Sequence, residues 1–143
     1  MKDFSVFLMD GSVKRQQPDR NLSESVMRDG KERLEDAMLS LKSGRKPKFI
    51  YENVYEALRE AADSILFLEG YKSFSHEATI SFLQKFKEIT AKEISEFDRM
   101  RAKRNGMKYY GKSCSEKDLE EAIKFAELLI RKLSEIRKKA ANL

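Results

Sequence analysis

Residues 47–70 read PKFIYENVYEALREAADSILFLEG, and this stretch decides the fold. Its apolar residues recur three or four positions apart, which gathers them on one side of an α-helix. The resulting stripe consists of Ile50, Val54, Ala57, Leu58, Ala61, Ile65 and Leu68, with Ala62 and Leu66 beside it. Lys46 and Pro47 mark the start of the helix and Gly70 marks its end. Because so broad a stripe needs cover on several sides, we predict that this helix lies at the centre of the protein.

Another amphipathic helix precedes the central one. Asp19, after Pro18, is a suitable N-cap, and Gly44 lies near the expected end. The apolar stripe of this helix consists of Leu22, Val26, Gly30, Leu34, Met38 and Leu41. A glycine inside a helix costs about 1 kcal/mol relative to alanine. Gly30 therefore has two explanations at this point: it allows a close helix crossing, or it is merely tolerated.

The residues before this helix form a separate segment. Phe4, Phe7 and Leu8 have the spacing of one helix face, and residues 11–18 have the composition of a connection. We therefore assign residues 1–18 to an N-terminal arm or short helix. Residues 19–143 are assigned to one helical bundle domain.

The sequence after Gly70 predicts three more helices. Ser73 or Ser75 caps the first, which begins at SHEATISF and points Ile80 and Leu83 inward, and the chain breaks near Thr90. The next carries Ile94, Phe97 and Arg104 along one side, and Asn105-Gly106 is a turn signal at its end. The last opens with the capping-box pattern of residues 115–118. Its stripe consists of Leu119, Ala122, Ile123, Ala126, Leu129, Ile130, Leu133 and Ile136.

The composition agrees with helices throughout. The chain has 143 residues, enough for one domain, and only six glycines and two prolines. An all-β sandwich or barrel needs more turns than so few of these residues provide. We predict an all-α fold: an antiparallel bundle of four long helices plus a short N-terminal helix.

Several kinds of site and location are excluded. With one cysteine and one histidine, a single chain forms neither a disulfide nor a His/Cys zinc site. No apolar run reaches the roughly 18 residues of a membrane span, so no membrane contact is expected. The N-terminus lacks the pattern of a secretory signal. We expect a cytoplasmic protein with no metal and no cofactor.

Positive charge is concentrated in residues 97–112, FDRMRAKRNGMKYYGK. This segment holds six basic residues and one acid, which accounts for the whole net charge of +5. Such a segment either attracts phosphate groups or forms an ordinary solvated helix face. Arg101, Arg104 and Lys108 share one face if the helix continues through Gly106. Arginine binds phosphate bidentately, and tyrosine stacks on bases or donates to phosphate oxygens, so these residues form a candidate phosphodiester site.

The chain resembles the HEPN domains, small helical-bundle proteins. The resemblance covers about residues 20–138 and rests on the central helix, the segment EGYKSFSHEA at 69–78, and Arg104-Asn105 near the end of a later helix. It implies a homodimer with an RNA- or nucleotide-facing cleft. Many members are metal-independent ribonucleases with toxin-like roles, and several are encoded beside a small nucleotidyltransferase that neutralises them.

The family's catalytic motif is an arginine, usually followed by a polar residue, with a histidine a few positions on. Arg104 and Asn105 match it, whereas Tyr109 occupies the expected histidine position. Histidine, with a pKa near 6.5, transfers protons at neutral pH, whereas tyrosine, with a pKa near 10, is a poor base there. The resemblance implies that Arg104 binds the scissile phosphate, Asn105 orients it, and Tyr109 donates a hydrogen bond. The supporting phosphate-binding residues would be Arg101, Lys103, Lys108 and Tyr110.

Four further side chains have open roles. Glu56 or Asp63 would pair with Arg104, or would belong to a charged outer face. His76 is expected to cap or pack locally, with contact to a ligand or a dimer partner as the alternative. Cys114 occupies a hydrophobic-staple position and is expected to be structural.

Two functions follow from this reading. The first is an RNA-directed protein with weak metal-independent endoribonuclease activity, acting as a toxin-like component. The second is a non-catalytic dimer that binds a nucleotide or a nucleotidyltransferase partner. A bundle whose basic residues only maintain solubility is a third possibility.

Overall fold

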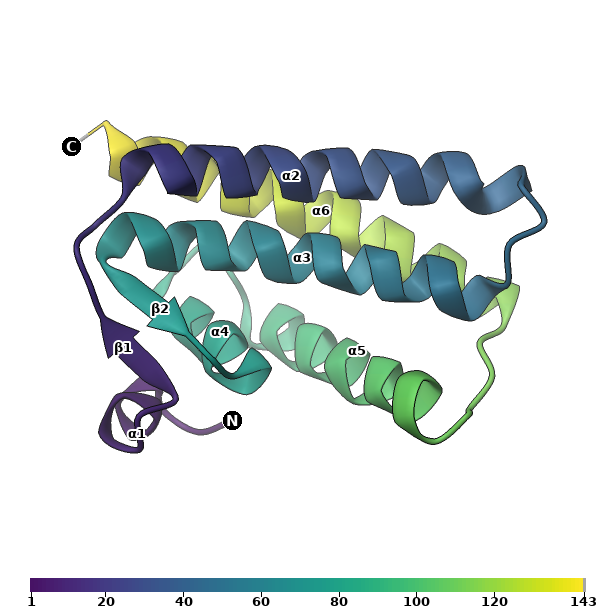
Figure 1. Ribbon diagram of the computed structural model, residues 1–143, viewed down its shortest axis with the longest axis horizontal. Coiled ribbons are helices and arrows are strands. Elements are labelled where there is room, and N and C mark those ends of the chain that lie inside the picture. Colours follow the sequence, from purple (N-terminus) through teal and green to yellow (C-terminus); the bar gives the residue numbers. More distant parts are fainter. Residues whose placement is uncertain (143) are drawn as a thin grey trace.

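The structure, a computed structural model, describes residues 1–142 and is built almost entirely of helices (Figure 1). The all-α prediction is confirmed, with four long helices, α2, α3, α5 and α6, and the short helices α1 and α4. The elements in chain order are α1 (Phe4–Met9), β1 (Val13–Arg15), α2 (Arg20–Leu39), the 3-10 turn η1 (Ser40–Lys42), α3 (Pro47–Glu69), β2 (Tyr71–Ser73), α4 (His76–Phe82), the 3-10 turn η2 (Leu83–Lys85), α5 (Ala91–Tyr109) and α6 (Glu116–Ala141).

Helix α3 lies at the centre, as predicted. It packs against α2 and α6 along its length, and α4 and α5 lie on its other side (Figure 1). Every residue of its predicted stripe is buried except Leu68, which is half-buried. Tyr51, Tyr55 and Ser64 are buried as well, although the stripe did not include them. Few positions of α3 are exposed, and most of its charged side chains pair within α3 or with neighbouring helices.

The predicted stripe of α2 is confirmed at Gly30 and Leu34 and wrong at its two ends. The residues that face the core are Ser23, Met27, Gly30, Leu34 and Ala37. Leu22, Met38 and Leu41 are exposed instead. A Cβ atom on Gly30 would lie 2.9 Å from the carbonyl oxygen of Ala57 in α3. Gly30 therefore lets the two backbones approach closely, and the small residues Ser23 and Ala37 are buried on the same side of α2.

A small antiparallel sheet was missed, so the prediction of helices throughout was wrong here. Strand β1 pairs with β2, with Val13 opposite Ser73 and Arg15 opposite Tyr71. It ties the N-terminal segment to the bundle beside a small core of Phe7, Val13 and Ala78. Residues 11–18, which were expected to form a connection, contain β1. This strand has only three residues, two of them cationic, so it shows no alternating strand pattern. Helix α1 confirms the short helix that was predicted near the N-terminus.

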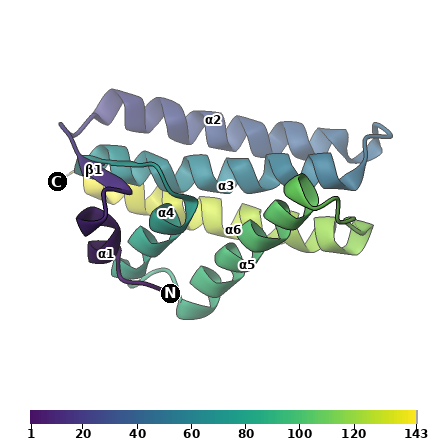
Figure 2. The ribbon, with the colours of Figure 1, turned by 60° about the horizontal axis from the view of Figure 1, so that its bottom comes forward.

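The helix ends follow their capping residues. Ser75, rather than Ser73, caps α4 by accepting a hydrogen bond from the Ala78 N–H at 3.2 Å. Thr90 caps α5 in a capping box with Glu93, where the break was predicted. Ser115 caps α6 in the predicted capping box with Asp118. Figure 2 shows that α5 runs obliquely to α3 and α6.

The turn signal at Asn105-Gly106 does not end α5, and the alternative, a helix that continues through Gly106, is what the structure shows. The helix continues through Asn105 and Gly106 to Tyr109, and the chain turns at Gly111, where φ is +65°. Arg104 and Lys108 therefore lie on the same helix, one turn apart. Beyond the turn, Cys114 packs against the core, and burial raises the pKa of its thiol. Within residues 1–142, no helix combines the length and apolar character that crossing a bilayer requires.

Candidate nucleic-acid interface

Two rows of polar side chains face each other between α3 and α5. Glu52 of α3 lies 3.3 Å from both Lys108 and Arg104 of α5. Glu56, one turn further along α3, lies 3.7 Å from Arg104. The two helices run in opposite directions here. Residues further along α3 therefore face residues nearer the start of α5.

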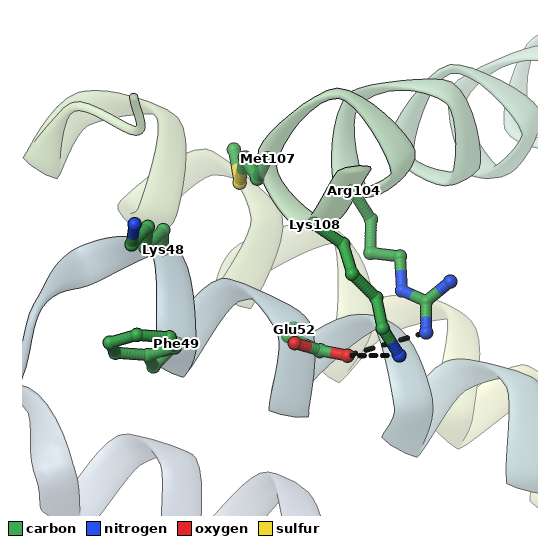
Figure 3. A pocket seen from close by; sticks show the side chains of 6 residues that line it. All are labelled: Lys48, Phe49, Glu52, Arg104, Met107 and Lys108. Atoms are coloured by element: carbon green, nitrogen blue, oxygen red, sulfur yellow. Dashed lines mark hydrogen bonds and ion pairs between the residues drawn. The ribbon is translucent and has the colours of Figure 1, made fainter. Parts of the chain in front are cut away.

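Arg104 is the most buried charged group of these rows. Its side chain is 9% exposed, and its Nη2 lies 3.3 Å from Glu52 Oε1 (Figure 3). Its Nη1 donates a hydrogen bond to Asn105 Oδ1 at 3.2 Å. Its Nε is buried and has no hydrogen-bond partner within the described residues. A buried donor without an acceptor costs roughly 1–3 kcal/mol, so this guanidinium has capacity for a further acceptor.

Two tyrosine rings lie near the Arg104 guanidinium. Its Cζ is 5.7 Å from the ring centre of Tyr55 and 6.0 Å from that of Tyr109. Both distances suit a cation–π contact. Tyr55 is fully buried, whereas Tyr109 is 63% exposed. Tyr55 thus fixes the guanidinium from the interior, while Tyr109 borders it at the surface.

A pocket of about 160 Å³ lies beside Arg104, and the residues that line it are Lys48, Phe49, Glu52, Arg104, Met107 and Lys108. Figure 3 shows Arg104 and Lys108 reaching from α5 toward Glu52 on α3. Three cationic residues and one carboxylate line the pocket, so it favours an anion. The exposed ring of Phe49 and the buried side chain of Met107 supply apolar surface. This combination suits a phosphate attached to an organic group.

Lys48, Phe49 and Met107 were not among the predicted site residues. Lys48 and Phe49 lie more than fifty positions before Arg104 in the sequence. The sequence around Lys48 and Phe49 resembles the first turn of many helices, so it does not indicate a binding site. The fold brings them together with Arg104 because the start of α3 packs beside the end of α5.

Acids from neighbouring elements neutralise much of the positive segment. Lys103 pairs with Asp118 of α6 at 2.7 Å, which turns it away from the pocket. Arg101 pairs with Asp98 at 2.8 Å and lies 3.6 Å from Glu77 of α4. The structure therefore brings Arg104, Asn105, Lys108 and Tyr109 together. Arg101 lies one turn away, and Lys103 and the exposed Tyr110 do not line the pocket.

Arg59 holds the two acids of α3 that were candidate supports for Arg104. Its Nη2 lies 2.8 Å from Glu56 and its Nη1 lies 2.6 Å from Asp63. Glu56 also approaches Arg104, whereas Asp63 accepts a hydrogen bond from Thr79 of α4 at 2.8 Å. Burial raises the pKa of Glu56, but the hydrogen bond and charge of Arg59 more than offset it and hold that pKa below its usual value. Burial raises the pKa of Asp63 to about 6.

His76 lies at the far end of the same polar rows. It is the first residue of α4, and its Nδ1 is 3.0 Å from the hydroxyl of Tyr55. Its ring is half-buried. Burial lowers the pKa of the imidazole below its usual value, and the nearby guanidinium of Arg59 lowers it further. No local sequence pattern indicates this placement, because the Tyr55–His76 contact joins two helices.

Comparison with known proteins identifies the family. The model of the HEPN domain matches residues 23–136, from the start of α2 to near the end of α6. The matched range contains the whole pocket and both polar rows. A search of curated proteins gives no match. Since the family match spans most of the chain, this protein belongs to the HEPN domain family.

Proposed function

We propose that this HEPN protein binds single-stranded RNA at the pocket between α3 and α5 and cleaves it weakly without a metal ion. The observation that carries the proposal is Arg104, a largely buried arginine that lines the pocket and whose Nε has no hydrogen-bond partner within the described residues. A buried arginine with a free donor, flanked by Lys48 and Lys108, suits a phosphodiester group.

The proposed binding mode uses the contacts of the free protein. A phosphate at Arg104 replaces Glu52 as the partner of the guanidinium, and Lys48 and Lys108 add charge from either side of the pocket. Asn105 keeps the guanidinium in its present orientation through the hydrogen bond from Nη1. The exposed hydroxyl of Tyr109 donates a hydrogen bond to a phosphate oxygen. Phe49 offers a surface on which a base can stack.

The proposed reaction needs no metal because the RNA supplies its own nucleophile. The 2′-hydroxyl next to the bound phosphate attacks phosphorus, and the 5′-oxygen of the next nucleotide leaves. Arg104 stabilises the negative charge that builds on the phosphate oxygens in the transition state. The expected products carry 2′,3′-cyclic phosphate and 5′-hydroxyl ends.

We propose that the active form is a homodimer in which two copies meet across α3 and α5. HEPN domains commonly dimerise, and three exposed aromatic residues, Phe49, Tyr109 and Tyr110, lie on or just beyond these two helices. Such a dimer places both Arg104 pockets in one cleft. Sedimentation velocity tests it: a monomer at micromolar concentration contradicts the dimer and leaves the RNA site of a single chain to be tested separately.

The second candidate function is a non-catalytic dimer that binds a nucleotide or a nucleotidyltransferase. It is favoured by Tyr109, since a phenol is a poor base at neutral pH and stands where the family motif has histidine. RNA that binds through Arg104 but is never cleaved would support this candidate. Binding of a nucleoside triphosphate, measured by calorimetry, would then identify the ligand class.

Fluorescence anisotropy with a labelled single-stranded RNA, in EDTA, tests the RNA site. Arg104→Ala is expected to weaken binding at least about tenfold, the loss expected when a buried charge-assisted contact is removed. Arg99→Ala is the matched control, because Arg99 lies on the same helix, is exposed and pairs with Glu96. It is expected to bind within about twofold of the wild type. Equal binding by Arg104→Ala and the wild type, with circular dichroism unchanged, would overturn the proposal.

A further inference from the structure

We propose that His76 is the group that accepts the proton of the attacking 2′-hydroxyl, held in place by Tyr55. This inference rests on the proposed function and assigns the proton transfer that Tyr109 performs poorly. It is carried by geometry: Tyr55 contacts both the phosphate-binding arginine and the histidine. The Arg104 Cζ is 5.7 Å from its ring centre, and its hydroxyl is 3.0 Å from His76 Nδ1.

Tyr55 is a rigid positioning residue. It is fully buried, and its ring also packs edge-on against Phe97 of α5. Burial raises the pKa of its hydroxyl far above the usual value, so the hydroxyl stays neutral. The proposed role uses the tautomer in which Nδ1–H donates to this hydroxyl oxygen and Nε2 carries the lone pair. Within the described residues, the contact with Tyr55 is the only side-chain hydrogen bond of His76, so Nε2 has no protein partner.

Charged groups from three helices surround the imidazole. Arg59 and Glu56 face it from α3, Arg101 and Arg104 from α5, and Glu77 follows it on α4. The arginines and burial lower the pKa of His76, while Glu56 raises it. At pH 7 the free protein therefore holds a neutral imidazole. A phosphate bound at Arg104 brings negative charge to this cluster and raises that pKa, which makes His76 a stronger base when RNA is bound.

The complete step neither gains nor loses a proton. The proton of the 2′-hydroxyl passes to His76 Nε2 as the 2′-oxygen forms its bond to phosphorus, and the bond from phosphorus to the 5′-oxygen breaks. The departing 5′-oxygen takes a proton from solvent water. The imidazolium then returns its proton to the hydroxide that remains, which restores the neutral histidine.

Nuclear magnetic resonance tests the placement directly, because His76 is the only histidine of the chain. Its C2 proton is titrated in the free protein and in complex with a 2′-O-methyl RNA, which binds but has no 2′-hydroxyl to react. The pKa of His76 is expected to rise by about 1 in the complex, the size of effect that a nearby charge produces. Arg104→Ala, in the presence of the same RNA, is expected to show no rise.

Cleavage tests the role. With unmodified RNA and EDTA, His76→Ala is expected to lose at least about 100-fold in cleavage rate while binding RNA as the wild type does. His76→Gln, which keeps a hydrogen-bonding side chain, is expected to be equally inactive. Tyr55→Phe removes the hydroxyl that orients the ring and is expected to lower the maximal rate with little change in KM. The acid limb of the wild-type pH profile is expected to follow the pKa of His76 in the complex.

The outcomes separate this inference from the RNA site itself. A His76 pKa that does not move when RNA binds through Arg104 would overturn the inference, as would cleavage by His76→Ala at the wild-type rate. RNA that binds through Arg104 without any cleavage would also overturn it and leave the binding function standing. Equal RNA binding by the wild type and Arg104→Ala would instead remove the proposed function, and this inference with it.

Discussion

Arg104 and Glu52 form an ion pair in which one carboxylate oxygen serves two cations. Glu52 Oε1 lies 3.3 Å from Arg104 Nη2 and 3.3 Å from Lys108 Nζ. The same oxygen therefore holds both Arg104 and Lys108 in the free protein. A phosphate that enters the pocket must replace it, so Glu52 competes with the proposed ligand.

Glu52→Gln is expected to strengthen RNA binding because it removes this competing charge. A partly exposed ion pair is worth up to about 1 kcal/mol, which corresponds to about fivefold in affinity. Fluorescence anisotropy at low salt measures the change. Glu60→Gln is the control, since Glu60 lies on the same helix and pairs with Arg33 of α2, away from the pocket. Weaker binding by Glu52→Gln than by Glu60→Gln would show that Glu52 supports the site.

Lys48→Ala is expected to weaken RNA binding several-fold and to reduce the salt dependence of binding by about one phosphate contact. Lys48 lines the pocket from the first turn of α3. Lys87, an exposed lysine between η2 and α5, provides the matched control. The measurement is the slope of log affinity against log salt concentration. Identical slopes for both alanine variants would place the RNA elsewhere.

Gly30→Ala is expected to destabilise the fold by about 1–3 kcal/mol, the usual cost of overpacking. The added Cβ would lie 2.9 Å from the Ala57 carbonyl oxygen and 3.3 Å from the Ala61 nitrogen. Both are backbone atoms of α3, so neither can move without shifting the helix. Urea denaturation, followed by circular dichroism, gives the free energy of unfolding.

Gly106→Ala is the control for this crossing. Gly106 is also helical, but its added Cβ would meet only the flexible side chain of Lys112, at 3.2 Å. Alanine has the better helix propensity, so the variant is expected to be as stable as the wild type or more stable. If Gly30→Ala were equally stable, close approach of α2 to α3 would not explain the buried face of α2.

The sequence predicts the helices well where apolar residues repeat and where caps are present. Thr90 and Ser115 marked helix starts correctly because a capping side chain acts within its own turn. The face of α2 was predicted correctly at Gly30 and Leu34 but not at Leu22 and Met38, which are exposed. The close crossing at Gly30, one of its two explanations, is what the structure shows. Strand β1 could not be predicted, since its three residues gain their structure from pairing with β2.

The candidate site was only partly visible in the sequence. Arg104 and Asn105 stand out because they are adjacent and match a family motif. Glu52 and Lys48, which line the same pocket as Arg104, come from the start of another helix. They lie outside residues 97–112, the segment in which the positive charge is concentrated. The link between Tyr55 and His76 depends on how α4 packs against α3, which no local pattern encodes.

Asp63 is expected to make the fold less stable as the pH rises. Its pKa of about 6 in the folded protein exceeds the usual unfolded value of about 3.9. Below pH 4 the group is protonated in both states. Between pH 4 and 6 the unfolded chain loses the proton first, so this group costs the fold about 2–3 kcal/mol by pH 7. Urea denaturation at several pH values measures the loss.

Asp63→Asn removes this titration while keeping a similar shape. Its free energy of unfolding is expected to fall less than that of the wild type between pH 4 and pH 7. Asp29→Asn, which changes an exposed acid of α2, is expected to follow the wild type. If the curves of Asp63→Asn and the wild type were parallel, the Asp63 carboxylate would be ionised throughout, held by Arg59.

The central claim is that Arg104 binds the phosphate at which RNA is cut. The most direct test is cleavage of single-stranded RNA in EDTA by the wild type, Arg104→Ala and Arg99→Ala. We predict cleavage by the wild type and Arg99→Ala, with 2′,3′-cyclic phosphate ends, and a loss of at least about 100-fold in Arg104→Ala. Cleavage by folded Arg104→Ala at the wild-type rate would contradict it.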